Sequence, residues 1–409
     1  MLEEICKNSK KASLELAKLD SKNKNEILFE AAKNLKDNME YILNENLKDI
    51  KYAKEIGLKD SLIDRLKLDE KRINSMVLGI QKIAYIPDPL NEYIEQKILE
   101  NGLIIGKKRV PMGVIGIIYE ARPNVTSDAF AMCIKAGSSV ILKGGKEALN
   151  SNKAIVKILR ESIVRLGFNE NFVNLITDSS RDTTNQFMRM NKYVNLLIPR
   201  GGASLINAVV NNSSIPVIET GVGNCHIYVD ESANIIKAID IIKNAKMQRP
   251  SVCNALETLI LHKSIIDKIM PELIKLNIDL RCDEYIKSIY PIVNLAKDED
   301  FENEFLDYIL AIKSVNNFDE AILHIQKYST GHSDGIITQN YSNANKFCDL
   351  IDSAVVYVNA STRFSDGECF GLGAEIGIST QKLHARGPMG LKEITSYKYI
   401  VLGDGQIRD

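Results

Sequence analysis

The run VIGIIYEARPNVTSDAFAMCIKAGSSVILKGGKE, residues 114–147, decides the fold class. It begins with a short apolar run rich in β-branched side chains, Val114–Tyr119, and a second apolar run follows at Ser139–Leu142. Between them, Ser127–Lys135 shows a helical pattern. Two buried strands joined by a helix form a β-α-β unit, and successive units build a parallel sheet. The sequence therefore predicts an α/β fold, in which ligands bind at the carboxyl ends of the strands.

Strand and helix patterns continue to alternate on both sides of Pro250. Before it we expect strands at Phe172–Ile176, Val194–Ile198, Ile215–Ile218 and His226–Val229, with helices at Glu147–Leu166 and Thr183–Met190. After it we expect strands at Leu256–Leu261, Tyr308–Val315, Ile336–Thr338 and Ala354–Asn359, with helices at Ser264–Leu276, Asp319–Tyr328 and Asn343–Ile351. The pattern thus predicts two consecutive α/β blocks.

The amino-terminal part differs from these blocks. Residues 3–86 show the three- and four-residue spacing of amphipathic helices. Two extended runs, residues 92–100 and 103–111, then flank Asn101-Gly102, a dipeptide typical of a β-hairpin. A two-stranded ribbon is marginally stable by itself, so the hairpin needs another domain or subunit to pack against. The segment Tyr397–Leu402 is also strand-like.

The composition excludes several classes of protein. The chain has 409 residues, a formal charge of −1, and 6% aromatic residues without Trp. Such a balanced charge argues against a nucleic-acid-binding surface, and no segment approaches the ~20 apolar residues of a membrane span. The seven cysteines contain no C-x-x-C pair, which is typical of reduced thiols. We therefore expect a cytoplasmic protein without nucleic-acid, membrane or metal partners.

One cysteine stands in a setting that favours chemistry. Cys253 lies in RPSVCNALET, between Pro250 and an expected strand, and Arg249 and Lys246 closely precede it. Neighbouring cations lower the pKa of a thiol and so increase the fraction of the nucleophilic thiolate. A buried and inert cysteine is the more common case, and Cys369 is the alternative nucleophile.

Two glycine turns follow expected strands and open helices. In LKGGKE, Gly144 and Gly145 permit close approach, and Lys143 is placed to reach a ribose hydroxyl or a 2′-phosphate; an ordinary turn is the alternative. In PRGGAS, free amides near Gly202, with Arg200 beside them, favour an anion.

Three further features have weaker signals. Glu219 ends an expected strand and suits acid/base work, although a solvated strand-end carboxylate is more common. The glycines of GVGNCH precede a strand, so this run is not a dinucleotide fingerprint. His324 and His332 have no third ligand at metal spacing, and we interpret them as structural or substrate-orienting.

Three segments together closely resemble the γ-glutamyl phosphate reductase family. They are RPSVCNALET, YEARPNVTSDA at 119–129, and AILHIQKYSTGHSDGI at 321–336, which is similar to the family signature. The loop at 358–380 is similar to the family's substrate and cofactor loop. The resemblance covers essentially the whole chain and implies membership of the aldehyde dehydrogenase superfamily.

The resemblance implies an aldehyde-dehydrogenase-like α/β fold. We expect a Rossmann-type NADP-binding domain, a second α/β catalytic domain and a β-hairpin oligomerisation arm. The NADP-binding domain is expected at residues 1–90 and 111–248, with 366–390 returning to it, the catalytic domain at 249–365, and the arm at 91–110 and 391–409.

The resemblance also implies a reaction. It is the NADPH-dependent reduction of L-glutamyl 5-phosphate to L-glutamate 5-semialdehyde and phosphate through a cysteine thioester, in proline biosynthesis. The implied partners are a separate glutamate 5-kinase, in transient contact, and further copies of the chain in a dimer or tetramer. A hydrolytic NAD(P)-dependent aldehyde dehydrogenase and a catalytically silent nucleotide-binding scaffold are the alternatives.

Individual roles follow from the same resemblance. Cys253 is the expected nucleophile, Lys143 the contact to the adenosine ribose, Glu304 the contact to the nicotinamide ribose, and Glu219 resembles the general base of hydrolytic relatives. Substrate and phosphate contacts are expected from Arg122, Asn124, Arg200, His332 and Arg363, and Gly144, Gly145 and Gly202 line the cofactor. The hydrolytic W-N-F-P and E-L-G-G-K stretches are replaced here by EARP and ETGVG. These changes are expected if the acyl group is exchanged between the cysteine and phosphate, and not between the cysteine and water.

Overall fold

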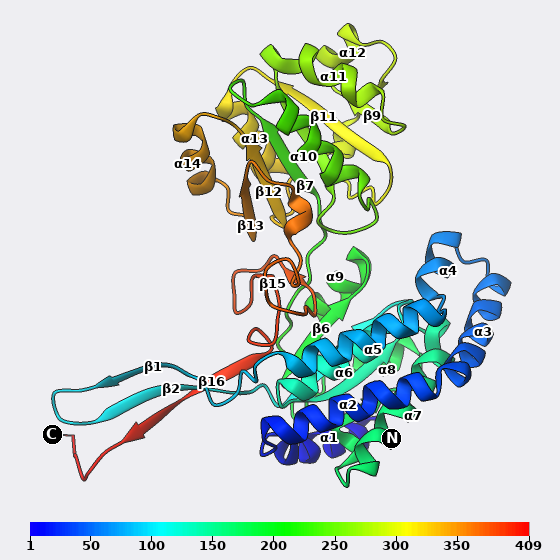
Figure 1. Cartoon of the computed structure of the whole chain (residues 1–409), viewed down its shortest axis with the longest axis vertical. Coiled ribbons are helices and arrows are strands. Elements are labelled where there is room, and N and C mark those ends of the chain that lie inside the picture. Colours follow the sequence, from blue (N-terminus) through cyan, green and yellow to red (C-terminus); the bar gives the residue numbers. More distant parts are fainter. Residues whose placement is uncertain (409) are drawn as a thin grey trace. The chain divides into compact units, whose positions relative to one another are not determined.

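The computed structural model describes residues 1–408, which form two compact units (Figure 1). Unit 1 consists of Met1–Glu219, Gly371–Gly377 and the residues from Met389 onward, and unit 2 of Thr220–Phe370 and Ile378–Pro388. The division after Glu219 lies ahead of the boundary expected at 248, because strand β7 (Cys225–Val229) pairs inside the sheet of unit 2. The loop expected to return to the first domain at 366–390 is likewise shared between the units.

The amino-terminal helices of unit 1 confirm the amphipathic pattern. They are α1 (Leu2–Leu16), α2 (Ser21–Asp37), α3 (Met39–Glu55), α4 (Asp60–Leu66) and α5 (Glu70–Tyr85). The carboxylates of Asp20 and Asp69 accept hydrogen bonds from the backbone N–H groups of Asn23 and Arg72, at 2.8 and 2.7 Å. These caps satisfy otherwise unpaired donors and fix where α2 and α5 begin.

A four-stranded parallel sheet, in the order β5-β4-β3-β6, lies at the centre of unit 1. The strands are β3 (Val114–Tyr119), β4 (Ser139–Gly144), β5 (Val173–Leu175) and β6 (Leu196–Arg200), and the intervening helices are α6 (Asn124–Lys135), α7 (Leu149–Arg165), α8 (Arg181–Phe187) and α9 (Ala203–Asn212). Every residue of β3 and β4 is buried, as expected of a parallel sheet covered on both faces. The β-α-β prediction is confirmed.

The strand expected at Ile215–Ile218 does not form. This segment makes a single bridge, between Val217 and Leu197. The N–H of Leu197 donates to the carbonyl of Pro216, and the N–H of Ile218 donates back to the carbonyl of Leu197, each at 2.9 Å. Pro216 itself has no N–H with which to extend the ladder, so the run does not become a strand, although Ile215 and Ile218 are buried.

The predicted hairpin is confirmed in an antiparallel sheet of unit 1 (Figure 1). Strand β1 (Tyr93–Ile98) pairs with β2 (Ile104–Pro111), and β16 (Thr395–Leu402) pairs with the other edge of β2. Gly102 in the turn has φ +85°, a conformation that glycine adopts without strain. The strand-like tail is therefore the third strand, and all of β1 is exposed.

A seven-stranded parallel sheet forms unit 2, in the order β10-β9-β11-β8-β7-β12-β13. Besides β7, the strands are β8 (Leu256–His262), β9 (Asp279–Cys282), β10 (Asn294–Leu295), β11 (Ile309–Val315), β12 (Ser333–Ile337) and β13 (Val355–Val358). The helices are α10 (Ile235–Met247), α11 (Ile266–Ile274), α12 (Glu284–Ile289), α13 (Phe318–Tyr328) and α14 (Tyr341–Leu350), and a small pair of strands, β14 (Ile378–Ser379) and β15 (Gly387–Pro388), completes the unit.

Helices cover both faces of this second sheet. One apolar cluster joins Ile227 of β7 and Leu259 of β8 to α10 and α11, and the other joins their neighbours Tyr228 and Ile260 to α13 and α14. Alternate residues of a strand point to opposite faces, so each strand supplies both clusters. Within residues 1–408, no helix has the length and apolar character needed to cross a membrane.

Candidate active site

Cys253 lies just before β8, at the amino-terminal edge of the sheet of unit 2. Strands β7, β8 and β12 begin there in register, with Cys225 opposite Leu256 and His226 opposite Asp334. The segments that precede these strands therefore meet at one edge. The Cys253 side chain itself is half-buried.

Gly223 fixes the peptide that carries Cys253. A Cβ at position 223 would lie 1.6 Å from the carbonyl oxygen of Cys253, so no other residue fits there. The N–H of Gly223 donates to Glu304 Oε1 at 2.8 Å, and the Cys225 thiol donates to the same Cys253 carbonyl at 3.2 Å. The structure thus brings Glu304 close to Cys253, and two neighbouring segments hold the cysteine's backbone.

The turn at 361–365 packs on the other side of this peptide. The side-chain amide of Asn254 donates to the carbonyl of Ser365 at 2.8 Å, and the Thr362 hydroxyl donates to the carbonyl of Asn254 at 2.7 Å. Burial lowers the pKa of Arg363, as does the nearby Arg249 guanidinium, and negative charge on Cys253 opposes that change. Arg363 therefore lies within electrostatic reach of the Cys253 sulfur.

Lys246 does not supply the positive charge near Cys253 that the sequence suggested. Its side chain is fully buried, and its Nζ lies 2.6 Å from Glu257 Oε2, which is also fully buried. The carboxylate of Glu257 neutralises it, whereas Arg363 interacts electrostatically with Cys253.

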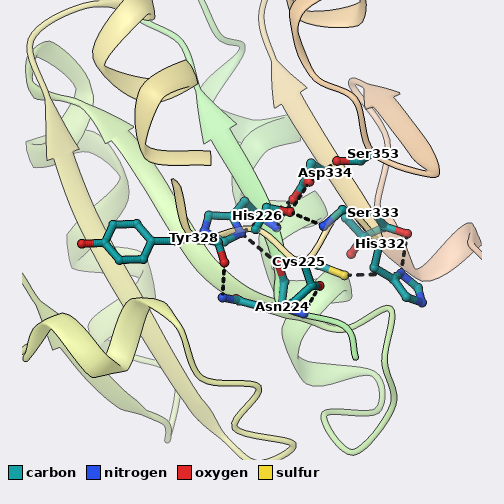
Figure 2. A network of polar contacts seen from close by, with 12 residues as sticks. Asn224, Cys225, His226, Tyr328, His332, Ser333, Asp334 and Ser353 are labelled. Atoms are coloured by element: carbon teal, nitrogen blue, oxygen red, sulfur yellow. Dashed lines mark hydrogen bonds and ion pairs between the residues drawn. The ribbon is translucent and has the colours of Figure 1, made fainter. Parts of the chain in front are cut away.

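His332 is completely buried beside Cys225 (Figure 2). Its Nδ1 lies 2.9 Å from Ser333 Oγ and 3.8 Å from the Cys225 sulfur. A chain of hydroxyls continues from Ser333 to Ser365 at 2.5 Å and on to Tyr357 at 2.8 Å. Burial lowers the pKa of His332 to about 4, so the ring is neutral at pH 7. Its Nε2 has no hydrogen-bond partner among residues 1–408. An unsatisfied buried nitrogen costs free energy, which a hydrogen bond with a bound ligand would recover.

Asp334 orders the start of β7 and β12 (Figure 2). One carboxylate oxygen accepts the N–H of His226 at 2.7 Å, and the other accepts the hydroxyls of Ser329 and Ser353, each at 2.5 Å. The carboxylate is fully buried and paired on both oxygens. Asp334 is therefore a structural member of the signature segment, two residues after His332 at the same sheet edge.

Lys143 and the glycines after it lie at the carboxyl end of β4 in unit 1. Lys143 is only 4% exposed; burial lowers its pKa, and the carboxylates of Asp178 and Glu147 oppose that shift. A Cβ at Gly144 would lie 2.2 Å from the side-chain amide of Asn152. The backbone here therefore packs too closely for any larger residue.

The second glycine turn connects β6 to α9. Gly202 is the residue before α9, and its N–H donates to Glu120 Oε2 at 3.0 Å. Negative charge is favoured at a helix amino terminus, and the chain supplies that charge itself. The anion expected beside Arg200 therefore has a competitor in the carboxylate of Glu120.

The other expected substrate contacts of unit 1 lie at the carboxyl ends of β3 and β6. The amide of Asn124 donates to Asp128 Oδ2 at 3.0 Å. Burial raises the pKa of Asp128 to about 6, opposed by Asn124 and by the nearby Arg200. Arg122 is exposed between β3 and α6. Unit 1 thus brings Asn124 and Arg200 close to Asp128, whereas His332 and Arg363 belong to unit 2.

Glu219, the suggested general base, is half-buried and is the last residue of unit 1 before the chain enters unit 2. Within residues 1–408, no three His, Cys, Asp or Glu side chains are grouped as a metal site would require.

Several residues near Cys253 were not singled out from the sequence. Gly223, Cys225, Asn254, Glu257 and Ser365 are all in contact with, or next to, the segment that carries it. For Gly223 a signal existed, because GVGNCH was recognised as a glycine run in an unusual place. Gly223 allows the backbone to pack closely against the peptide of Cys253, whereas the glycines of a dinucleotide fingerprint allow close packing against a pyrophosphate.

Comparison with known proteins defines the class. The model of the aldehyde dehydrogenase family matches residues 1–303. An acetylating aldehyde dehydrogenase from Geobacillus thermoglucosidasius has the same fold, with a TM-score of 0.72 at 16% identity over 100% of this chain and 97% of that one. The chain belongs to the aldehyde dehydrogenase family, and the predicted fold class is confirmed.

Closer relatives place the chain within that family. A gamma-glutamyl phosphate reductase from Caldanaerobacter subterraneus subsp. tengcongensis is 54% identical over 98% of both chains, and one from Clostridium botulinum (strain Eklund 17B / Type B) is 57% identical over 86% of both. The crystal structure of gamma-glutamyl phosphate reductase from Thermotoga maritima matches 100% of both chains with a TM-score of 0.97 and 48% identity. The chain is thus a member of the γ-glutamyl phosphate reductase family.

Proposed function

We propose that this chain reduces L-glutamyl 5-phosphate to L-glutamate 5-semialdehyde, releasing phosphate, in proline biosynthesis. Relatives that are more than half identical and match it nearly end to end are named for this reductase activity. The observation that supports this chemistry is the environment of Cys253. Its thiol is half-buried, Gly223 and Cys225 hold its backbone in place, and Arg363 lies within electrostatic reach.

The proposed chemistry passes through a thioester on Cys253. The Cys253 thiolate attacks the acyl carbon, the carbon–oxygen bond to phosphate breaks, and phosphate leaves. Arg363 favours the thiolate and would neutralise the departing phosphate with its planar fork of donors. NADPH, when bound, supplies the hydride that reduces the thioester. The carbon–sulfur bond then breaks, the aldehyde is released and Cys253 is free again.

The residues present fit a nicotinamide dinucleotide. In unit 1, Lys143 at the end of β4 would hold the adenosine ribose. In unit 2, Glu304 Oε1 is anchored by the N–H of Gly223, and the carboxylate would hold the nicotinamide ribose. An engineered glycolyl-CoA reductase of the same fold contains NADP+. NADPH, as opposed to NADH, is our choice because Lys143 is suited to a 2′-phosphate.

The decisive assay is phosphate-dependent reduction of NADP+ with pyrroline-5-carboxylate, the cyclised semialdehyde. Cys253→Ala should lower kcat at least ~1000-fold, because residue 253 can then no longer form the thioester, and should leave NADPH affinity unchanged in a fluorescence titration. Cys369→Ser, at an exposed cysteine, is the matched control and should retain activity. Turnover by Cys253→Ala at the wild-type rate would refute the proposal.

The alternatives give different results in the same assay. A hydrolytic aldehyde dehydrogenase would oxidise the semialdehyde without inorganic phosphate, whereas this chain should require it. A silent scaffold would leave Cys253 unreactive, whereas substrate should protect Cys253 from alkylation at neutral pH.

We also propose that the chain forms a dimer or tetramer through its three-stranded sheet. Apolar side chains are exposed along β1 and β16, including Ile98, Tyr399 and Val401, and such strands are normally covered. Sedimentation of Ile98→Lys/Val401→Lys should show smaller particles than the wild type.

A separate kinase must supply the labile acyl phosphate, and we propose that it makes transient contact with this chain. Co-sedimentation of the two proteins would show that contact. We place the reaction in the cytoplasm, where the cysteines would stay reduced.

A further inference from the structure

A buried ion pair lies beneath the active site without a role in the chemistry above. Lys246 of α10 and Glu257 of β8 are both fully buried, with 2.6 Å between Nζ and Oε2. Burial raises the pKa of Glu257 to about 7 and lowers that of Lys246. Replacing such a pair by apolar residues of similar size is often neutral or stabilising, because desolvation offsets the attraction. Stability therefore does not explain why the pair is there.

The second oxygen of Glu257 anchors the loop that carries Glu304. Its Oε1 accepts the N–H of Leu306 at 3.2 Å. Leu306 has φ +54°, a left-handed conformation that is uncommon for a leucine and persists only where the surroundings impose it. Phe305 lies between Glu304 and Leu306 in the sequence, and the Nζ of Lys246 is 6.0 Å from the centroid of its ring. The ion pair thus holds the loop by one hydrogen bond and one cation–π contact.

This loop in turn reaches the peptide of Cys253. Glu304, two residues before Leu306, accepts the N–H of Gly223 at 2.8 Å. Gly223 packs against the Cys253 carbonyl so closely that a Cβ would lie 1.6 Å from its oxygen. A shift of the loop would therefore move Glu304, release Gly223 and loosen the cysteine's backbone.

We propose that Lys246 and Glu257 are positioning residues for the Cys253 site. Lys246 fixes the carboxylate of Glu257, Glu257 holds the backbone at Leu306, and Glu304 and Gly223 transmit that position to Cys253. Neither side chain touches substrate. The inference rests on the proposed function, since it assigns the pair a part in that reaction.

The test replaces the pair by apolar residues of similar size, Lys246→Met/Glu257→Leu. If the pair positions the site, the melting temperature stays near that of the wild type, while kcat falls roughly tenfold to a hundredfold, because small misplacements of reacting groups are costly. The rate at which iodoacetamide alkylates Cys253 should change as well. Lys246→Met/Glu257→Gln keeps an oxygen that can accept from Leu306, and it should recover most of the lost kcat.

A second buried lysine provides the control. Lys24, in unit 1, is 1% exposed and is paired with Asp88, far along the chain from Cys253. Lys24→Met should lower the melting temperature but leave kcat and the alkylation rate of the folded enzyme unchanged. If the apolar pair at 246 and 257 does not fold, Lys246→Met alone should show the same roughly tenfold loss of kcat, because the buried carboxylate of Glu257, unlike the neutral amide of Glu257→Gln, is left as an unpaired charge and would leave its position at Leu306.

Wild-type kcat and alkylation rate in both the apolar double variant and Lys246→Met would overturn the inference. Failure of the proposed function is distinguishable, because the wild-type enzyme would then show no phosphate-dependent reduction of NADP+. The alkylation rate of Cys253 would still report whether the pair positions it.

Discussion

The two units contain the same kind of sheet but place their functional residues at opposite edges of it. In unit 1, Lys143, Arg122 and Arg200 follow or end strands, at the carboxyl edge of the four-stranded sheet. In unit 2, Cys253 and His332 precede strands, at the amino edge of the seven-stranded sheet. The rule that ligands bind at carboxyl ends therefore agrees with the candidate residues of unit 1 and not with those of unit 2.

The two edges also differ in how their polar groups are satisfied. At the edge in unit 1, neighbouring groups of the chain pair with each other, as Gly202 does with Glu120 and Asn124 with Asp128. At the edge in unit 2, several buried atoms are left without hydrogen-bond partners among residues 1–408, namely Asn224 Oδ1, Asn254 Oδ1 and His332 Nε2, whereas at the edge in unit 1 one such atom, Asn152 Nδ2, lies beside Gly144. The paired groups at the edge of unit 1 suit a site that binds a ligand reversibly. The buried groups around Cys253 suit a reacting group that is held rigidly, and we call these groups the rigid frame of unit 2. The two edges should therefore respond differently to substitution.

The largest effect is expected from Gly223→Ala, in the rigid frame of unit 2. The added Cβ would overlap the Cys253 carbonyl, so the peptide must move, and kcat should fall about 100-fold or more. Steady-state kinetics and the alkylation rate of Cys253 measure this. Gly79→Ala is the matched control, because the nearest atom that a Cβ there would meet, Asp128 Oδ1, lies 3.9 Å away; it should keep full activity. An unchanged alkylation rate in Gly223→Ala would show that the frame is not rigid.

A smaller and different effect is expected from Lys143→Met, at the binding edge of unit 1. Loss of the ammonium should raise the KM for NADPH about tenfold, the value of one charged hydrogen bond, with kcat within about twofold of the wild type. Lys157→Met, at an exposed position of α7, should change neither constant. A fall in kcat at unchanged KM would place Lys143 in the chemical step and break the contrast between the units.

The smallest effect on activity is expected from His324→Phe, which removes a buried polar atom from unit 2; the change to measure there is one of stability. His324 packs against Phe301 and Tyr328, with ring centroids 5.0 and 4.7 Å away, and its Nε2 has no partner among residues 1–408. Burial, followed by the nearby His226, lowers its pKa to about 3.

The sign of the pH effect follows from this lowered pKa. An unfolded histidine titrates near pH 6.5, so between about pH 3 and 6.5 the unfolded state binds more protons. The free energy of unfolding therefore falls as the pH drops from 7 to 4.5, and His324→Phe should lose roughly 2 kcal/mol less over this range. Urea unfolding at both pH values measures the difference, and equal losses in the two proteins would contradict the assignment.

Much of the fold was predictable because its signals are local. The strand Val114–Tyr119 and the Asn101-Gly102 hairpin are found where apolar runs and turn residues placed them. By contrast, β9 and β10 were missed, since four and two residues are too short to show a period. The boundary at Glu219 was missed because it depends on which sheet β7 joins, and that choice is made by contacts far apart in sequence.

The site was predictable only where chemistry leaves a mark on the sequence. Cys253 could be selected from its neighbours and from the resemblance. Its supporting contacts could not, because Glu304 reaches Gly223 across 81 positions, and Cys225 reaches Cys253 across 28. Lys246 was misread for the same reason: the sequence shows a nearby cation but not the glutamate that neutralises it.

The sheet that joins β2 to β16 has a consequence for how the protein is made. Arg109 of β2 donates to Thr395 of β16, 286 positions later in the chain. During translation, β2 therefore waits with one edge open while all of unit 2 is synthesised, and an open edge is a template for pairing with other chains. If the ribosome translates unit 2 slowly or pauses there, the edge of β2 stays open for longer. The yield of folded protein in the cell should therefore depend on chaperones that shield newly made strands.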